Sequence, residues 1–156
     1  MDTGGQARAA SLAAAMRERD AFGRWLGVEL LDVAPGRCAV RMTVRPDMLN
    51  GFGVCHGGVT FAVADSALAV ASNTHGRVTL SVENGISYPA PAREGDVLTA
   101  VAEEESAGER LAFYRVVVRR QDATAVALFR GTVYRTGRTM DGGAAGAETD
   151  ETRRGR

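Results

Sequence analysis

The segment from Val59 to Asn73 is apolar on almost every side of the helix that it would form. Such a helix cannot lie on a protein surface, because apolar side chains would then face water, so it must be enclosed by other elements. Its many alanines allow a sheet to approach closely, and Phe61 and Leu68 are the bulky side chains left to make contacts. The chain must therefore fold around one buried helix.

Alternation of polar and apolar residues with a period of two, which is typical of strands, precedes and follows this helix. The links between the last three of these segments are short, which predicts an antiparallel meander. A single curved antiparallel sheet of about five to six strands around the helix, an α+β arrangement, accounts for this order. The predicted strands are Val28–Val33, Arg37–Val44, Val78–Tyr88, Asp96–Ser106, Arg110–Arg120 and Ala123–Tyr134.

The length of 156 residues and the hydrophobic content of 45% suit one globular domain with a core of its own. We place this domain at residues 21–136. Residues 1–20 are rich in alanine with scattered charges, and we predict either a short helix or a frayed extension there. Residues 137–156 have no apolar pattern, and we predict a disordered tail.

The 19 basic and 19 acidic side chains cancel, so net charge gives no reason to expect nucleic acid or an anionic membrane as a partner. Cys38 and Cys55 lack metal-site spacing, and with only two histidines in the chain we predict no metal site. We predict two free thiols in a reducing compartment. The first residues lack a signal-peptide pattern, and no apolar run approaches the roughly 20 residues of a membrane span, which predicts a cytoplasmic protein.

A long loop with four glycines leads into the helix and places His56, Gly57 and Gly58 at its start. A helix start offers unpaired N–H groups and the positive end of a macrodipole, which favour developing negative charge. Further along the helix, Asp65 lies among apolar residues, where a carboxylate is costly unless it is paired or its raised pKa is useful. We interpret these two features as the halves of an acyl-transfer site.

The two halves are too far apart to act together within one chain. Asp65 follows Gly57 by eight residues, a rise of about 12 Å along a helix. A general base and an oxyanion donor must both lie about 3 Å from one reacting group. If both serve one reaction, Asp65 must face the His56-Gly57 loop of a second subunit, which predicts a symmetric dimer with shared sites.

Each of these residues also has an ordinary structural interpretation, and the residues alone leave both open. Asp65 can be a buried acid paired with an arginine, and His56 can cap the helix or bond a loop carbonyl. Asn50 can serve only as a turn residue, and Gly57-Gly58 only as a tight turn that permits close packing. Cys55, beside His56, is a further candidate as a reactive thiol.

The spaced motif Asn50-x5-His56-Gly57-Gly58-x2-Phe61-x2-Ala64-Asp65-x-Ala67 resembles the phenylacetate-pathway acyl-CoA thioesterases of the hotdog superfamily. The resemblance extends from about Phe22 to Thr136. It includes Ala71-Ser72-Asn73 with Gly76, the passage from Tyr88-Pro89-Ala90-Pro91 to Gly95-Asp96, and the run from Val126 to Gly131.

The resemblance implies a hotdog fold, dimers with a continuous sheet, and commonly tetramers. It implies hydrolysis of aryl or phenylacetyl-type acyl-CoA thioesters without a metal or redox cofactor, coenzyme A being part of the substrate. By position, Asp65 matches the catalytic carboxylate of one subunit, as base or nucleophile. Gly57 matches the residue of the facing subunit whose N–H polarises the thioester carbonyl. His56 and Asn50 match residues that hold the thioester and the attacking water.

We assign further substrate contacts near the loop and the strand turns, and expect arginines there to meet the CoA phosphates. Relatives commonly carry an arginine just before the second proline of the loop after the helix, where this chain has Ala90. The assigned residues are Gly58, Phe61, Tyr88, Pro89, Arg93 and Arg110.

Three other functions fit parts of the pattern. A non-catalytic acyl-CoA-binding hotdog module needs the pocket but not Asp65. A hotdog enoyl-CoA hydratase needs an Asp/His pair for water addition, and His75 is poorly placed for it. A purely structural oligomer leaves the costly acid unexplained. We therefore favour the thioesterase.

Overall fold

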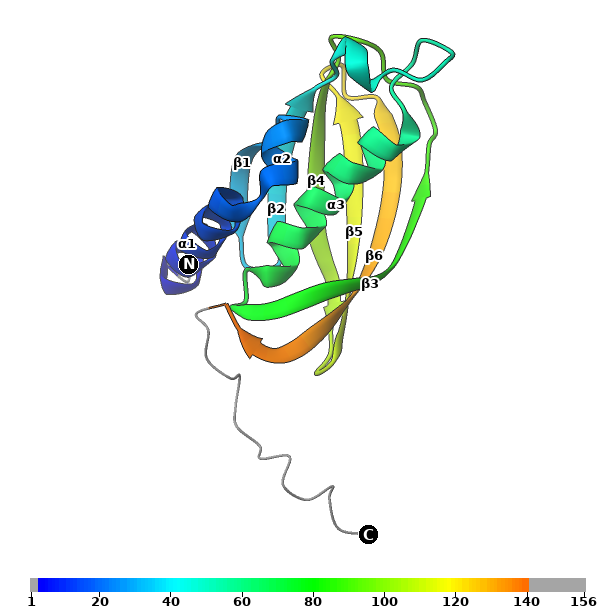
Figure 1. Ribbon diagram of the computed structural model, residues 1–156. Helices are drawn as coiled ribbons and strands as arrows, with labels where there is room; N and C mark the ends of the chain where they lie inside the picture. Colours follow the sequence, from blue (N-terminus) through cyan, green and yellow to red (C-terminus); the bar gives the residue numbers. More distant parts are fainter. Residues whose placement is uncertain (1–2, 141–156) are drawn as a thin grey trace.

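The computed structural model describes residues 3–140 and shows one curved antiparallel sheet wrapped around a central helix, α3 (Figure 1). The six strands lie in the order β1-β2-β4-β5-β6-β3. This arrangement confirms the predicted α+β architecture. The elements are α1 (Thr3–Arg19), α2 (Ala21–Leu26), β1 (Glu29–Ala34), β2 (Arg37–Thr43), a short 3-10 helix (Pro46–Met48), α3 (Gly57–Asn73), β3 (Arg77–Ser87), β4 (Val97–Ala107), β5 (Leu111–Arg120) and β6 (Ala125–Thr139).

Helix α3 is the centre of the hydrophobic core, as its apolar composition predicts. Val63, Ala64 and Leu68 recur at helical spacing and are almost fully buried against the sheet. The opposite side of the helix is more open: Ala69 is exposed and Asp65 is partly buried. One face of α3 therefore builds the core, and the other is left for the N-terminal helices and for the site.

The sheet places the strand after α3 beside the last strand of the chain. Strands β4, β5 and β6 form the predicted meander, and β3 pairs antiparallel with β6. Asn84 of β3 stands opposite Gly131 of β6. A Cβ atom at position 131 would collide with Leu68 of α3 and would lie 3.0 Å from Asn84 Oδ1. Glycine here lets helix and strand approach closely.

Asn73, the last residue of α3, ties the helix to the start of β3. Its amide Nδ2 donates to the carbonyl of Ala69 at 2.8 Å and to the hydroxyl of Thr79 at 2.9 Å. Its Oδ1 accepts from the Thr79 N–H at 3.0 Å. Three bonds from one buried side chain therefore fix the corner between helix and strand.

The N-terminal extension is helical and packs onto the domain. Ala9 and Ala13 of α1 are buried, and Gln6 Nε2 donates to the Val33 carbonyl of β1 at 2.6 Å. Asp20 caps α2 by accepting from the Gly23 N–H at 2.8 Å, and Gly27 ends that helix in the left-handed conformation with φ of 81°. Of the residues for which we predicted either a short helix or a frayed extension, Thr3–Arg19 are helical.

At the other end of the chain, β6 runs through Thr139, three residues past the predicted domain boundary. The extension exists because Thr139 pairs with Arg77 at the start of β3. The rest of the predicted tail, residues 141–156, lies outside the described residues. Cys38 and Cys55 are both buried free thiols, as predicted. Within residues 3–140, no helix combines the length and apolar character that crossing a membrane requires.

Candidate active site

The loop before α3 is held in place by backbone hydrogen bonds on two sides. The N–H of His56 donates to the Met48 carbonyl, and the N–H of Cys55 donates to the Ala92 carbonyl, each at 2.8 Å. Together with the loop after β3, this segment encloses a cavity of about 390 Å³. The lining residues are Asn50, Val54, Cys55, Gly57, Thr60, Tyr88, Pro89, Ala90, Pro91, Ala92 and Val126.

Gly57 is the first residue of α3, and its N–H makes no hydrogen bond within the described part of the chain. Its carbonyl accepts from the Tyr88 hydroxyl at 2.9 Å. A Cβ atom at position 57 would lie 3.2 Å from the ring and hydroxyl of Tyr88, so glycine allows the ring to lie against the backbone. The uncommitted N–H at the positive end of the helix is suited to a developing oxyanion.

His56 caps α3, which was one of its two structural interpretations. Its Nδ1 accepts from the Gly58 N–H at 2.9 Å, so the proton of the neutral ring lies on Nε2. The Gly58 N–H is consumed by this bond and is not open to a substrate. His56 is exposed, and its Nε2 has no hydrogen-bond partner among the described residues.

Asn50 shapes the loop with its oxygen and keeps its amide group available. Its Oδ1 accepts from the N–H groups of Phe52 at 2.9 Å and Val54 at 3.4 Å, which is an Asx-type turn. Asn50 also lines the cavity that Gly57 lines. The turn interpretation is therefore observed, and it does not exclude a contact with substrate through the amide.

Asp65 is held by a side chain from β3. Asn84 Nδ2 donates to Asp65 Oδ1 at 3.2 Å, and the Ser81 hydroxyl donates to Asn84 Oδ1 at 2.9 Å, which fixes the orientation of the amide. Burial raises the pKa of Asp65 above its usual value, and the Asn84 bond opposes part of that rise. No arginine pairs with Asp65 among the described residues. The arginine-paired interpretation is therefore wrong.

Asp65 does not line the cavity of Gly57. It lines a separate cavity of about 240 Å³ between α3 and the two N-terminal helices. Because Gly57 and Asp65 stand eight residues apart on one straight helix, their separation follows the helical rise of about 12 Å. Within one chain, Gly57 and Asp65 therefore line two separate cavities, and we refer to them below as the two proposed half-sites.

The structure brings some of the predicted substrate residues together and leaves others apart. Tyr88 and Pro89 join Asn50 and Gly57 around the larger cavity. Phe61 instead packs edge-to-face on Phe129, with ring centroids 5.3 Å apart.

The two predicted arginines are also placed differently. Arg93 follows Ala92 of the cavity wall, and its N–H donates to Asp96. Arg110 immediately precedes β5, at the end of that strand away from the cavity, and its carbonyl accepts from the Arg135 N–H. The arginine that reaches the loop after β3 is Arg120, whose Nη1 donates to the Pro91 carbonyl at 3.2 Å.

Two residues of the Asp65 half-site, Ser81 and Asn84, were missed from the sequence. An asparagine followed by glycine is unusual inside a strand, and this was the available signal. Cys55 behaves as an inert core residue: burial raises the pKa of its thiol, which disfavours the reactive thiolate.

Comparison with known proteins gives the family. Residues 52–127 match the model of the thioesterase superfamily. The acyl-coenzyme A thioesterase PaaI of Escherichia coli is 39% identical over 130 residues, covering 83% of this chain and 93% of that protein. This chain belongs to the thioesterase superfamily.

Solved structures of the thioesterase superfamily agree with this chain in fold. The E. coli PaaI protein from the phenylacetic acid degradation operon superposes with a TM-score of 0.85 at 37% identity, covering 86% of this chain and 97% of that one. The TT0310 protein of Thermus thermophilus gives 0.73 at 42% identity, covering 76% and 99%. The predicted hotdog fold and the predicted thioester hydrolase class are confirmed.

Proposed function

We propose that this chain hydrolyses acyl-CoA thioesters of the aryl or phenylacetyl type. The observation that carries the proposal is the Asp65 carboxylate, which has one oxygen held by Asn84 and the other without a hydrogen bond in the described chain. The names of the E. coli relatives, an acyl-CoA thioesterase and a protein of a phenylacetic acid degradation operon, support the substrate class.

The reaction needs one base and one oxyanion donor, because a thiolate is a good leaving group. Asp65 takes a proton from water as the water oxygen attacks the thioester carbonyl carbon. The Gly57 N–H stabilises the oxyanion that forms. The carbon–sulfur bond then breaks, and the CoA thiolate leaves and takes up the proton from Asp65. The raised pKa of Asp65 favours this base role over attack by the carboxylate itself. We assign no metal or redox cofactor to the reaction.

The two half-sites require a second subunit. In the proposed dimer, Asp65 of one protomer faces the Gly57 loop of its partner, and Asn50 and His56 hold the thioester and the water there. β3 is an edge strand with exposed Leu80 and Val82, which supports a continuous sheet across a two-fold axis.

We also propose that the dimers pair into a tetramer. The outer face of the sheet supports this, because it carries the exposed side chains of Phe113, Leu128 and Tyr134. For coenzyme A, Arg93 remains the proposed phosphate contact beside the larger cavity. A contact from Arg110 would require the coenzyme A portion of the substrate to reach the opposite end of the sheet.

The geometry disfavours the two alternative functions. A hydratase with its Asp/His pair in one chain would need a histidine beside Asp65, but His75 Nε2 lies 2.9 Å from Glu104 Oε2, beyond the C-terminal end of α3. A module that only binds acyl-CoA would have no use for a carboxylate whose pKa is raised by burial.

The decisive test replaces Asp65 by asparagine, which keeps the shape and removes the base. Hydrolysis of phenylacetyl-CoA, followed by thiol release, is expected to lose a factor of about 10²–10⁴ in kcat. Calorimetric binding of the same thioester is expected to persist. Unchanged turnover in the Asp65→Asn variant would overturn the proposal.

A further inference from the structure

Helices α1 and α2 build one wall of the cavity that Asp65 lines. The wall opposite belongs to α3, so the cavity lies between the N-terminal extension and the open side of the central helix. Its volume is about 240 Å³. The lining residues are Met16, Arg17, Asp20, Phe22, Asp65, Ser66, Ala69 and Val70.

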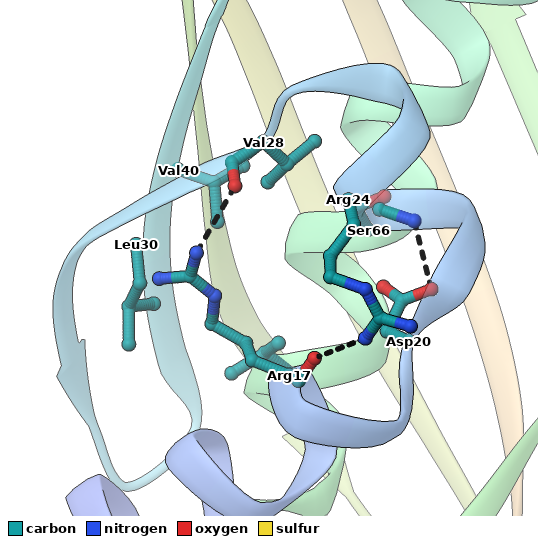
Figure 2. Close-up of a pocket in the computed structure, with 9 residues that line it drawn as sticks. Arg17, Asp20, Arg24, Val28, Leu30, Val40 and Ser66 are labelled. Atoms are coloured by element: carbon teal, nitrogen blue, oxygen red, sulfur yellow. Dashed lines mark hydrogen bonds between the residues drawn. The ribbon is translucent and has the colours of Figure 1, made fainter.

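Arg17, Asp20 and Ser66 each make a side-chain hydrogen bond within the chain through one of their polar atoms. Figure 2 shows Arg17 directed at the Val28 carbonyl, with a bond of 3.2 Å, and Asp20 at the start of α2, where its Oδ1 accepts from the Gly23 N–H. The Ser66 hydroxyl donates to the Ala62 carbonyl at 2.8 Å. Met16, Phe22, Ala69 and Val70 supply the apolar part of the lining, and Arg17 and Asp20 supply a charged part.

The cavity also borders a second space. A smaller cavity of about 30 Å³ shares the side chains of Arg17, Asp20, Ser66 and Val70 with it. Its remaining walls include Val28, Leu30 and Val40, which Figure 2 shows on the side of Arg17 away from Asp20. On that side the chamber beside Asp65 adjoins the buried Val40 as well as the charged side chains of Arg17, Asp20 and Arg24.

We propose that this chamber receives the acyl group of the thioester, and that α1 and α2 set the size of acyl group that the enzyme accepts. The inference rests on the proposed function, since Asp65 must stand beside the carbonyl carbon that water attacks. The acyl substituent is bonded directly to that carbon, so it must occupy space adjoining Asp65. The CoA portion of the bound thioester extends in the opposite direction, toward the partner's loop. The unbranched Met16 side chain adapts its shape to the acyl group.

The test fills the chamber from both walls and measures selectivity rather than activity alone. Met16→Trp places a larger side chain in the chamber from α1, and Ala69→Leu places a larger side chain in it from the exposed side of α3. For each variant, kcat/KM is measured with phenylacetyl-CoA and with acetyl-CoA. The ratio of kcat/KM for phenylacetyl-CoA to that for acetyl-CoA is expected to fall about tenfold or more, because the bulky acyl group loses its space and the small one does not. Ala14→Trp, at an exposed α1 position outside the cavity, is the matched control and should keep the wild-type ratio.

The outcomes separate this proposal from the proposed function. A wild-type ratio in both folded cavity variants, with wild-type hydrolysis intact, would overturn the acyl chamber and leave the thioesterase standing. Absence of hydrolysis of every acyl-CoA by the wild-type enzyme would instead overturn the proposed function. The Ala69→Leu variant keeps the test valid if the larger Met16→Trp change unfolds the protein, and circular dichroism decides which variants are compared.

Discussion

The start and the middle of α3 offer two different kinds of group to the proposed reaction. At the start, the donor of Gly57 is a backbone N–H whose direction is fixed by the helix, and Tyr88 holds the same residue through its carbonyl. In the middle, Asp65 is a side chain whose ionisation depends on burial and on Asn84 from another element. The first half-site is set by local chain geometry, and the second by tertiary packing.

After Asp65→Asn, the largest expected effect comes from removing the backbone donor. Proline is accepted at the first position of a helix, and His56 already has the extended backbone, φ −62° and ψ 134°, that a residue before proline requires. Gly57→Pro therefore deletes the N–H and should preserve α3. We expect kcat for acyl-CoA hydrolysis to fall by about 10²–10³ in a thiol-release assay.

Gly57→Ala is the control, because it adds a Cβ atom against Tyr88 but keeps the N–H. Equal losses in both variants would show that crowding, not the donor, caused the effect. Mixing Gly57→Pro with Asp65→Asn subunits extends the comparison. In a dimer with shared sites, half of the assemblies are hybrids with one intact site, and about a quarter of wild-type activity should return. No recovery after verified subunit exchange contradicts the shared site.

The tuning of Asp65 by Asn84 should appear in the pH dependence. The Asn84 amide stabilises the ionised carboxylate, so Asn84→Leu removes an interaction that lowers the pKa of Asp65. The base is active only when ionised. The acid limb of the kcat profile is therefore expected to move to higher pH.

Glu83→Ala serves as the matched variant, since Glu83 is the strand neighbour, stands opposite Thr132 and is exposed. Its profile should coincide with that of the wild type. A shift toward lower pH in Asn84→Leu would show that the amide does not act on the ionised form.

The smallest expected effect is on stability. Burial raises the pKa of Asp65 in the folded chain above its ordinary value of 3.8, so the wild type loses stability as pH rises from 3.8 through the raised value. Asp65→Asn lacks this loss and should melt at a higher temperature than the wild type at pH 7.5. The difference should vanish at about pH 3.8 and below, where both side chains are neutral. A lower melting temperature at pH 7.5 would contradict the cost assigned to the buried charge.

The same contrast explains what the sequence could predict. The helix and most strands follow from periodicity, and the Gly57 half-site follows from His56-Gly57-Gly58 at a helix start. Ser81 and Asn84 could not be placed beside Asp65, because their contact depends on β3 pairing with β6 across Gly131. The Asp65 cavity could likewise not be predicted, since residues 1–20 have no strong pattern to show where α1 packs.

The corner at Asn73 has a consequence for how this chain can vary. Its two bonds to Thr79 tie α3 to β3 so tightly that one inserted residue between positions 74 and 78 would shift Asn84 away from Asp65. The tip of the loop before α3 is different, because Phe52 is 92% exposed and no atom lies within 4 Å of a Cβ built at Gly51 or Gly53. Changes in length are therefore expected to accumulate at that tip, while the turn after the helix keeps a constant length.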